Sequence, residues 1–493
     1  MTYSSVVSRD SVRIGFLIAA LNGLEILAAD IGNAYINADV REKVYFIAGD
    51  EFGAMRKGKP VIIVKALYGL KTSGAAWRAH FADTLHSLGF TSSLADPDVW
   101  YRADSKPDGF EYYSYILVYV DDILVISHDS KTIMSTIAKC FRLKDGYAEP
   151  TRYLGATIQK WKIIGDEVAS HWGHSAEEYV KQAIANVELE LAKEGKQLQG
   201  RYSTPTSPNY HPELDYSPYL NDMPAQYYME LIGILRWIVE LGRMDIMVDV
   251  SLLSSYTMQP RLGHLDQVFH IFGYLKRNKR ATLIFDESRV DWNESSFQTN
   301  DWTDFYRDAK ELLPPNAPTP RGNAVQINCF VDADHAGNHV TRRSQTGVLI
   351  FLNRTPILWY SKSQNTVETS TFGSEFTALR IAVELLDSLR YKLRMFGVPL
   401  EGPVNTFCDN SSAVTNATMP ESTLKKKHNS IAYHRVREAI AAGVLRIAWV
   451  QSGNSLADML TKPLNGPTLH NLMNKVLYLS NVTWDDEQAV TNK

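Results

Sequence analysis

The stretch ILVYVDDILVISHD, residues 116–129, decides the fold of the first part of this chain. Two apolar runs flank a pair of adjacent carboxylates, Asp121 and Asp122. Because neighbouring side chains of a strand point to opposite faces, both acids serve one site only if the backbone turns between them. The pattern predicts a β-hairpin with its tip at residues 120–122. Two charges beside an apolar ribbon indicate either a cation-binding site or an exposed acidic turn.

A second segment, ILAADIGNAYINADV (26–40), favours the cation-binding site. It places Asp30 at the end of another apolar strand, with Tyr35 five residues further on. Phosphoryl transfer with Mg²⁺ uses hard oxygen ligands that converge from separate elements. Asp30 and the acidic hairpin together predict such a site. An acidic tight turn at 121–122 and a core aromatic at Tyr35 remain the alternatives.

Length and composition describe an ordinary globular protein. The 493 residues are enough for about three domains, and 45% are hydrophobic and 22% charged. A formal net charge of −4 gives no overall basic field. The three cysteines, Cys140, Cys329 and Cys408, exclude a disulfide framework and a Cys/His zinc knuckle, which fits an intracellular compartment. The apolar stretch at 14–21 is too short to span a membrane and predicts a buried helix.

The pattern along the chain changes three times. Strand-like runs dominate the first part, at 26–31, 44–48, 61–67, 114–120 and 123–127. Amphipathic helices are expected at 176–195 and 225–242, each ending in glycine. A proline-rich stretch closes the segment up to 322 and is the best linker. Three consecutive strands are then expected at 325–334, 347–353 and 356–363, with a hairpin turn at Asn353-Arg354. They precede a long helix at 374–397, strands at 404–409 and 444–451, and a short helix at 455–461.

Five carboxylates are spread over four elements of this last part of the chain. Asp332 and Asp334 lie two apart on a strand, hence on one face. Glu375 begins the long helix, Asp409 ends a strand and Asp458 opens the last helix. Each acid alone is most simply a surface group or a helix-start carboxylate. A set placed on successive elements instead predicts a second metal site, in which we rank Asp332 above Asp334.

Four motifs occur in the order found in the palm of reverse transcriptases: ADIGNAYIN (29–37), KALYGLKTSGAAW (65–77), YVDD (119–122) and RYLGATI (152–158). The chain most closely resembles the copia-type LTR retrotransposon class. The resemblance implies that Asp30 and Asp121 bind both catalytic metals, with Asp121 as the bridging ligand and Asp122 in support. It also implies a steric gate at Tyr35. The remaining implied residues are Tyr68, Gly69 and Lys71 in the nucleotide pocket, and Tyr153, Leu154 and Gly155 as the primer grip.

The later acids resemble the Asp-Glu-Asp-Asp set of RNase H. The surrounding SQTGVLIFLN (344–353), TSTFGSEFTAL (369–379), KKKHNSIAYHRVRE (425–438) and LADMLTKPL (456–464) are similar to the copia-type version of that domain. The resemblance implies two Mg²⁺ ions held by Asp332, Glu375, Asp409 and Asp458. Cellular and retroviral RNases H often have a histidine before the last Asp, and WVQSGNSLAD (449–458) contains none.

Basic residues supply further candidate contacts to nucleic acid. Lys276 and Arg277 follow Tyr274 in a plausible phosphate-tracking run. Family similarity adds Lys425, Lys426, Lys427 and His428, and the nearby His434. A solvated helix end or helix face is the alternative for both groups. The middle region departs from the family pattern, with Arg243-Met244-Asp245 in place of Arg-Pro-Asp, and Thr72 and Gly74 in place of Gln and Pro.

The resemblance therefore implies an α/β protein: an α+β polymerase palm with partial fingers, a helical thumb and connection region, and an RNase H-like domain with a mixed sheet. The expected parts are partial fingers and palm (1–160), thumb and connection (161–290), linker or insertion (291–323), RNase H-like domain (324–470) and C-terminal tail (471–493). The implied cofactor is Mg²⁺, two ions per active site, with Mn²⁺ as a substitute.

The implied activity is RNA-directed DNA synthesis linked to cleavage of RNA in RNA/DNA hybrids, during retrotransposon replication. Implied partners are an RNA template, a DNA primer, the hybrid, dNTPs and other products of the polyprotein, with no membrane. The implied location is intracellular, in the cytoplasm within a virus-like particle or in the nucleus. The basic fingers segment expected upstream is not found in this sequence. A truncated copy that keeps only the nuclease, or a catalytically silent hybrid-binding product, is therefore the alternative.

Overall fold

The computed structural model describes residues 4–162, 170–424 and 427–479. The chain forms two compact units. Unit 1 consists of residues Met1–Pro150, Pro314–Asn323 and Lys392–Pro399, and unit 2 of residues Thr151–Leu313, Ala324–Tyr391 and Leu400–Lys493. The class is mixed α/β, as expected from the sequence. None of the helices in the described ranges is long and apolar enough to cross a membrane.

Unit 1 is built on a five-stranded antiparallel sheet in the order β1-β7-β6-β5-β4. Its strands are β1 (Glu25–Asp30), β4 (Thr91–Ser92), β5 (Val99–Ser105), β6 (Glu111–Tyr119) and β7 (Asp122–Ser127). Its helices are α1 (Arg9–Leu21), α2 (Ser73–Ser87) and α3 (Ser130–Cys140), with short 3-10 turns at Ala34–Asn37 and Asp50–Phe52. A separate ribbon pairs β2 (Asp39–Ile47) with β3 (Pro60–Lys65).

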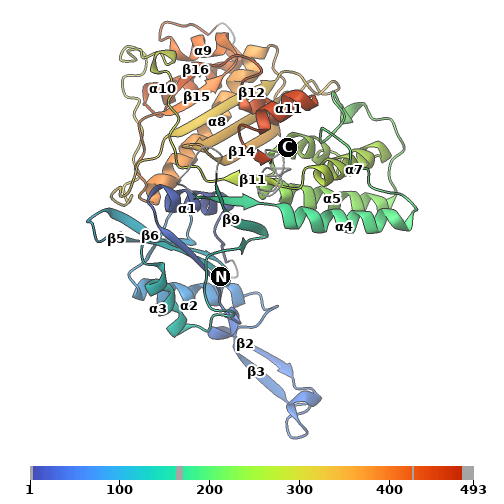
Figure 1. Ribbon diagram of the computed structural model, residues 1–493, viewed down its shortest axis with the longest axis vertical. Coiled ribbons are helices and arrows are strands. Elements are labelled where there is room, and N and C mark those ends of the chain that lie inside the picture. Colours follow the sequence, from blue (N-terminus) through green and yellow to red (C-terminus); the bar gives the residue numbers. More distant parts are fainter. Residues whose placement is uncertain (1–3, 163–169, 425–426, 480–493) are drawn as a thin grey trace, which may run out of the picture. The chain divides into compact units, whose positions relative to one another are not determined.

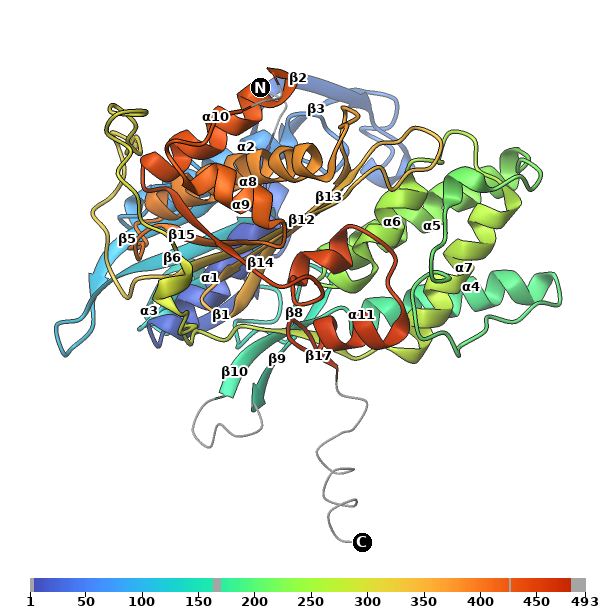
Figure 2. The same ribbon diagram turned by 90° about the horizontal axis from the view of Figure 1, so that it is seen from above.

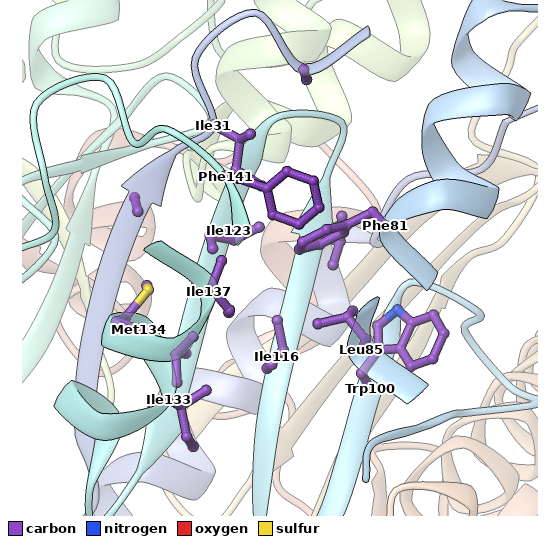
Figure 3. Packing of buried hydrophobic residues seen from close by; sticks show 14 of the residues in the cluster. Ile31, Phe81, Leu85, Trp100, Ile116, Ile123, Ile133, Met134, Ile137 and Phe141 are labelled. Atoms are coloured by element: carbon purple, nitrogen blue, oxygen red, sulfur yellow. The ribbon is translucent and has the colours of Figure 1, made fainter. Parts of the chain in front are cut away.

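Both faces of the central strands are covered, which explains why β6 and β7 are almost continuously apolar. On one face Ile116 and Ile123 pack with side chains of α2 and α3, as Figure 3 shows for ten labelled residues. On the other face lies α1. A Cβ on its Gly15 would stand 3.1 Å from a side-chain carbon of Leu117 and 3.0 Å from one of Ile126, so the helix approaches the sheet closely there. The predicted buried helix at 14–21 is confirmed.

The predicted hairpin is confirmed. Tyr119 of β6 pairs with Asp122 of β7, which leaves Val120 and Asp121 as a two-residue turn. Val120 has a φ of 60°, in the left-handed region that a β-branched residue rarely adopts. Glycine normally takes this first position of such a turn. A valine there is strained and must be held by its surroundings.

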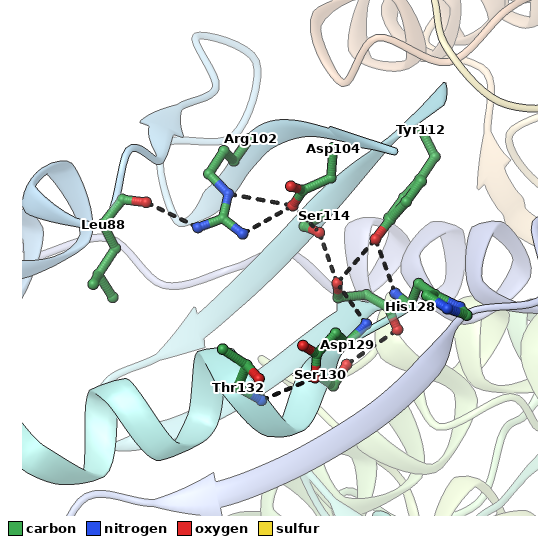
Figure 4. A network of polar contacts seen from close by, with 10 residues as sticks. Leu88, Arg102, Asp104, Tyr112, Ser114, His128, Asp129, Ser130 and Thr132 are labelled. Carbon is green, nitrogen blue, oxygen red and sulfur yellow. Dashed lines mark hydrogen bonds and ion pairs between the residues drawn. The ribbon is translucent and has the colours of Figure 1, made fainter. Parts of the chain in front are cut away.

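A polar network fixes the end of β6 and β7 that lies away from this turn (Figure 4). The Ser114 hydroxyl donates to the Ser127 hydroxyl at 2.8 Å, and Tyr112 is 3.2 Å from the same oxygen. Asp129 caps α3 by accepting the Thr132 N–H at 3.1 Å. The strand ends are therefore locked in register before the chain turns into α3.

Unit 2 begins with a sheet in the order β17-β11-β10-β9-β8 and a set of helices. The strands are β8 (Arg152–Tyr153), β9 (Ala156–Lys162), β10 (Ser170–Ser175), β11 (Ala281–Ile284) and β17 (Tyr478–Leu479). The helices are α4 (Glu177–Lys193), α5 (Asp222–Glu240), α6 (Met247–Ser254) and α7 (Leu262–Arg277), with 3-10 turns at Pro212–Leu214, Met244–Ile246 and Glu294–Ser296. The sequence predicted the amphipathic helices but not these short strands, because two- to seven-residue runs carry little periodicity.

The second sheet of unit 2 is mixed, in the order β14-β13-β12-β15-β16. Its strands are β12 (Ile327–Asp334), β13 (Gln345–Leu352), β14 (Thr355–Ser363), β15 (Val404–Cys408) and β16 (Leu445–Trp449). β12 is antiparallel to β13 and parallel to β15, and β15 is parallel to β16. Around it lie α8 (Thr371–Met395), α9 (Ser411–Thr418), α10 (Ser430–Ala441) and α11 (Gly466–Met473), with a short 3-10 turn at Lys427–Asn429 (Figures 1 and 2).

The three predicted strands and the turn at Asn353-Arg354 are confirmed, since Leu352 pairs with Thr355. The expected short helix at 455–461 is present as a 3-10 helix, Leu456–Leu460. Its five residues are too few for a stable α-helical segment. The boundaries of the five expected domains are not tested by this division into two units, and they stay predictions.

Candidate active sites

The strand register of unit 1 brings Asp30 next to the acidic hairpin. Asp30 is the last residue of β1 and pairs with Asp122, the first residue of β7. Residues directly opposite in an antiparallel pair point to the same face, so these two carboxylates share one side of the sheet. Asp121 lies in the turn, directly before Asp122. Asp30, which is far away in the sequence, thus meets the Asp121–Asp122 pair at one strand end.

Two hydrogen bonds hold the backbone of the strained turn. The Ile31 N–H donates to the Asp121 carbonyl at 2.8 Å. The Trp77 indole N–H donates to the Val120 carbonyl at 2.7 Å. Trp77 is buried and stacks on Phe81, with ring centroids 5.3 Å apart. The hydrophobic core therefore fixes the turn through one aromatic side chain, a role for Trp77 that sequence reasoning missed.

The electrostatics of this cluster favour a cation. Burial, followed by the charges of Asp121 and Asp30, raises the pKa of Asp122 to about 6. Lys144 offsets part of this effect, and its Nζ lies 3.6 Å from Asp30 Oδ2. Lys144 also donates its backbone N–H to the Asp30 carbonyl at 2.9 Å. The donor set consists of carboxylate oxygens, which suits Mg²⁺ or Mn²⁺.

Two tyrosines flank the acids. The rings of Tyr35 and Tyr68 lie 4.4 Å apart, so the residue expected as a steric gate contacts one expected in the nucleotide pocket. Partial burial and the charge of Asp121 raise the pKa of the Tyr68 phenol. Gly69 has a φ of 96°, and Lys71 is exposed. The structure brings Tyr35 and Tyr68 to the carboxylates, whereas the roles of all four residues stay predictions.

For the DNA synthesis that the sequence resemblance implies, we expect Trp77→Phe to lower the rate by about 10-fold while costing only about 1–2 kcal/mol of unfolding free energy. Phenylalanine keeps most of the ring packing but leaves the Val120 carbonyl without its donor. The matched control is Phe81→Leu, which disturbs the same core without touching the turn. Adding Val120→Gly to Trp77→Phe should restore part of the activity, because glycine adopts a positive φ without strain. Steady-state primer extension and urea unfolding measure both quantities. Equal losses in the two single variants would contradict a positioning role for Trp77.

The mixed sheet of unit 2 collects the second set of acids. Asp332 lies on β12, Glu375 in the second turn of α8, Asp409 directly after β15 and Asp458 in the last 3-10 helix. Oxygens of Asp332, Asp409 and Asp458 lie within 4.8 Å of one another. Glu375 groups with Asp409 in the same way. The parallel pairing of β12 with β15 is what places Asp332 and Asp409 side by side.

Three of these carboxylates are buried: Asp332, Glu375 and Asp458 are 3%, 5% and 4% exposed. Burial, followed by the charge of Asp332, raises the pKa of Glu375 and of Asp409, and that of Asp458 to about 7. Among the described residues, Asp458 Oδ1 is buried without a hydrogen-bond partner. Mutually repelling, buried oxygens with a free acceptor are the donor set expected around divalent cations.

Sequence reasoning also missed three neighbours of this cluster. The Thr461 hydroxyl donates to Asp332 Oδ2 at 2.6 Å. Burial lowers the pKa of Lys462, but the charges of Asp332 and Asp458 outweigh this effect and raise that pKa. Cys408 Sγ lies 3.8 Å from a Glu375 oxygen. The motif LADMLTKPL contains the first two residues, but only the folded chain turns them toward Asp332. Asp334 lies outside the close group around Asp332.

The unfolding free energy of the metal-free protein is expected to fall as pH rises from about 4 to about 7. The pKa of Asp458 is about 7 in the folded chain against an ordinary 3.8, so the folded state binds more protons in this range. Asp458→Asn should remove this contribution and stabilise the metal-free protein at pH 8 by about 1–3 kcal/mol. Urea unfolding in EDTA at pH 5 and pH 8 tests this, with the exposed Glu421→Gln as control. A variant no more stable than wild type at pH 8 would contradict it.

The other predicted contacts are placed as follows. Leu154 and Gly155 form the turn of the β8–β9 hairpin, with φ of 48° and 87°, next to the buried Tyr153. Lys276 Nζ lies 2.6 Å from Glu188 Oε1, and Arg277 donates to the Arg201 carbonyl at 3.2 Å. These bonds give both side chains partners within unit 2, and a contact of the basic run with nucleic acid stays a prediction.

The second basic group lies partly outside the described residues. Lys425 and Lys426 belong to the undescribed part of the chain. Lys427 is exposed in a 3-10 turn that also contains His428, whose side chain is not described. His434 Nδ1 is 2.6 Å from the Tyr306 hydroxyl. A contact of this surface with nucleic acid stays a prediction.

The chain is similar to known reverse transcriptases and Pol polyproteins. Residues 1–190 match the family model described as reverse transcriptase (RNA-dependent DNA polymerase). The retrovirus-related Pol polyprotein from transposon RE1 of Arabidopsis thaliana is 26% identical over 481 residues, which cover 96% of this chain and 29% of that protein. The corresponding polyprotein from transposon TNT 1-94 of Nicotiana tabacum is 25% identical over 93% of this chain and 31% of its own length. This chain thus spans less than a third of these relatives.

The solved structures that match are more distant. A foamy viral protease-reverse transcriptase in complex with RNA/DNA hybrid is 12% identical, with a TM-score of 0.44 over 89% of this chain and 45% of that chain. The LC11-RNase H1 in complex with RNA/DNA hybrid is 16% identical, with a TM-score of 0.23 over 28% of this chain and 94% of that chain.

Each unit thus presents its own set of carboxylates on a sheet, at the β1–β7 strand ends in unit 1 and on the mixed sheet in unit 2. The part of the chain up to residue 190 matches the reverse transcriptase family, and the chain as a whole is similar to retrovirus-related Pol polyproteins of plant transposons.

Proposed function

We propose that this chain is a reverse transcriptase that copies RNA and DNA templates into DNA and also cleaves RNA in RNA/DNA hybrids. The observation that carries the proposal is that each unit gathers its own set of carboxylates from separate elements. In unit 1 these are Asp30, Asp121 and Asp122, joined by the β1–β7 register. In unit 2 they are the acids around Asp332.

Each set has a defined task in this proposal. Divalent cations held by such carboxylates supply Lewis-acid stabilisation to phosphoryl transfer. Asp30 and Asp121 bind them for DNA synthesis and Asp122 supports the cluster. Asp332, Glu375, Asp409 and Asp458 bind them for hybrid cleavage, with two Mg²⁺ ions per site. The Thr461 hydroxyl orients Asp332 through its 2.6 Å hydrogen bond.

Substrate selection is assigned to side chains around the acids. The Tyr35 ring, packed against Tyr68, excludes a ribose 2′-hydroxyl from the incoming nucleotide. Gly69 and Lys71 complete the nucleotide pocket, and the β8–β9 turn serves as the primer grip. RNA in a hybrid is distinguished by its 2′-hydroxyls. The partners are an RNA template, a DNA primer, dNTPs and other polyprotein products, within the cytoplasm or the nucleus.

The decisive experiment measures both activities on one purified preparation of the chain. A labelled DNA primer on an RNA template is extended with dNTPs and Mg²⁺, and a labelled RNA strand in a hybrid is followed for cleavage. EDTA should stop both reactions, and Mn²⁺ should restore them. Cleavage without extension would leave only the nuclease. Absence of both, with hybrid binding intact, would reduce the chain to a silent binding product.

A further inference from the structure

A cluster of imidazoles and one carboxylate lies outside both acidic sites. His211 and Glu213 belong to the segment before α5, and His339 to the loop between β12 and β13. The two imidazole rings stack, with centroids 3.9 Å apart and an interplanar angle of 25°. One possible ligand atom from each of the three residues lies within 4.8 Å of the other two. Two segments more than 120 residues apart thus converge on one point of unit 2.

Glu213 is the centre of this cluster. Its side chain is 6% exposed, and Oε1 lies 3.1 Å from His211 Nδ1. The same oxygen accepts the backbone N–H of His339 at 2.8 Å. In the described part of the chain, neither a lysine nor an arginine forms an ion pair with this carboxylate. A buried carboxylate with two imidazoles and no fixed cation is a site at which a divalent ion is favoured.

We propose that His211, Glu213 and His339 bind one Zn²⁺ ion per chain. Two imidazole nitrogens and one carboxylate oxygen are borderline ligands that suit zinc better than magnesium, which prefers all-oxygen sets. The fourth position is left to water. This site is separate in chemistry from the acid cluster around Asp332, and its ligand set does not depend on either proposed activity.

The geometry needs only a small adjustment. Ligands roughly 2.0–2.1 Å from a tetrahedral zinc ion lie about 3.3 Å from one another. The His211 Nδ1 to Glu213 Oε1 distance is already 3.1 Å. His339 is exposed, so its ring is free to rotate out of the stack toward the ion. Its backbone N–H bond to Glu213 keeps the loop in place during that rotation.

An ion at this position fastens the segment before α5 to the β12–β13 loop. That loop directly follows Asp334, and its Ala336 and Arg342 have φ of 52° and 58°. His211, Glu213 and Asp334 line one cavity of about 570 Å³. Zinc therefore rigidifies the wall of this cavity at a strained loop, and stabilises unit 2 against unfolding.

The test is zinc binding by the full chain, stripped of metals and kept in excess Mg²⁺ to occupy the all-oxygen sites. Calorimetric titration with Zn²⁺ should give one site per chain, and Co²⁺ should give a visible absorption band of four-coordinate geometry. His339→Ala should weaken binding at least about 100-fold and abolish the zinc-induced rise in Tm. His339 is the residue of choice because its exposed side chain can be removed without opening the core.

Two further variants separate this site from other binding. His470→Ala removes an exposed imidazole on α11 of the same unit and should leave affinity and stoichiometry unchanged. His211→Ala should reproduce the loss seen with His339→Ala. Circular dichroism before titration establishes that each variant is folded. Unchanged zinc affinity in folded His339→Ala and His211→Ala, or no saturable zinc binding by wild type, would overturn the proposal and leave a stacked imidazole pair alone.

Discussion

Asp121→Asn is expected to reduce templated DNA synthesis by at least about 10²–10³-fold while hybrid cleavage stays within about 2-fold of wild type. Asparagine has the shape of aspartate but lacks the charge that a divalent cation requires. The turn itself should persist, because its two backbone hydrogen bonds, from Ile31 to the Asp121 carbonyl and from Trp77 to the Val120 carbonyl, do not involve the replaced carboxylate. Single-turnover primer extension on an RNA template measures the effect.

The matched control for this variant is Asp129→Asn. Asp129 follows the other end of β7 and caps α3, so its replacement tests a general loss of stability in the same part of unit 1. It should leave the extension rate nearly unchanged. Extension by Asp121→Asn at the rate of wild type would remove Asp121 from the reaction, and an equal loss of hybrid cleavage would point to misfolding.

Asp332→Asn is expected to reduce hybrid cleavage as strongly as Asp121→Asn reduces DNA synthesis, and to leave DNA synthesis nearly unchanged. Asp332 lies in the close group with Asp409 and Asp458, and burial, followed by the charge of Asp332, raises the pKa of Glu375, Asp409 and Asp458. Asparagine at this position lacks one carboxylate oxygen that could bind a cation. The Thr461 hydroxyl, which donates to Asp332 Oδ2, would then have a neutral acceptor in place of a charged one. A labelled hybrid measures cleavage, and primer extension on a DNA template serves as the parallel measurement.

Asp334→Asn provides the comparison for Asp332. Both residues belong to β12 and are two apart, but only Asp332 lies in the close group with Asp409 and Asp458. We therefore expect Asp334→Asn to keep most of the cleavage activity. A larger loss in Asp334→Asn than in Asp332→Asn would reverse the ranking of the two ligands. With Asp121→Asn, these variants assign each activity to one unit.

Much of the fold follows from local patterns. Period-two alternation and continuous apolar runs indicate β6, β7, β12 and β13, and the residue pairs at 120–121 and 353–354 indicate their turns. Short strands such as β8 and β11 carry too few residues for periodicity and become strands only by pairing with neighbours. The last acid was expected on a short helix, and only the structure shows that these five residues form a 3-10 helix.

Some of the candidate site residues could likewise be predicted from the sequence, whereas the contacts of others could not. Residue type and motif order single out Asp30, the 121–122 pair and the later acids, because hard oxygen ligands on successive elements have few other uses. The basic run at 276–277 shows the limit of such reasoning. The sequence does not show which residue a lysine contacts. In the folded chain Glu188 Oε1 lies 2.6 Å from Lys276 Nζ.

The sequence by itself predicted two carboxylate sets, one of them on an acidic hairpin, and carried the resemblance to a known family. The tertiary structure alone decided which contacts surround these acids. These contacts are the pairing of Asp30 with Asp122 and the hydrogen bond from the Trp77 indole to the Val120 carbonyl. They also include the hydrogen bond from Thr461 to Asp332 and the stacking of His211 on His339. The physical reason is that a local pattern fixes which face a side chain occupies, while its partner depends on packing between segments that are far apart in the chain.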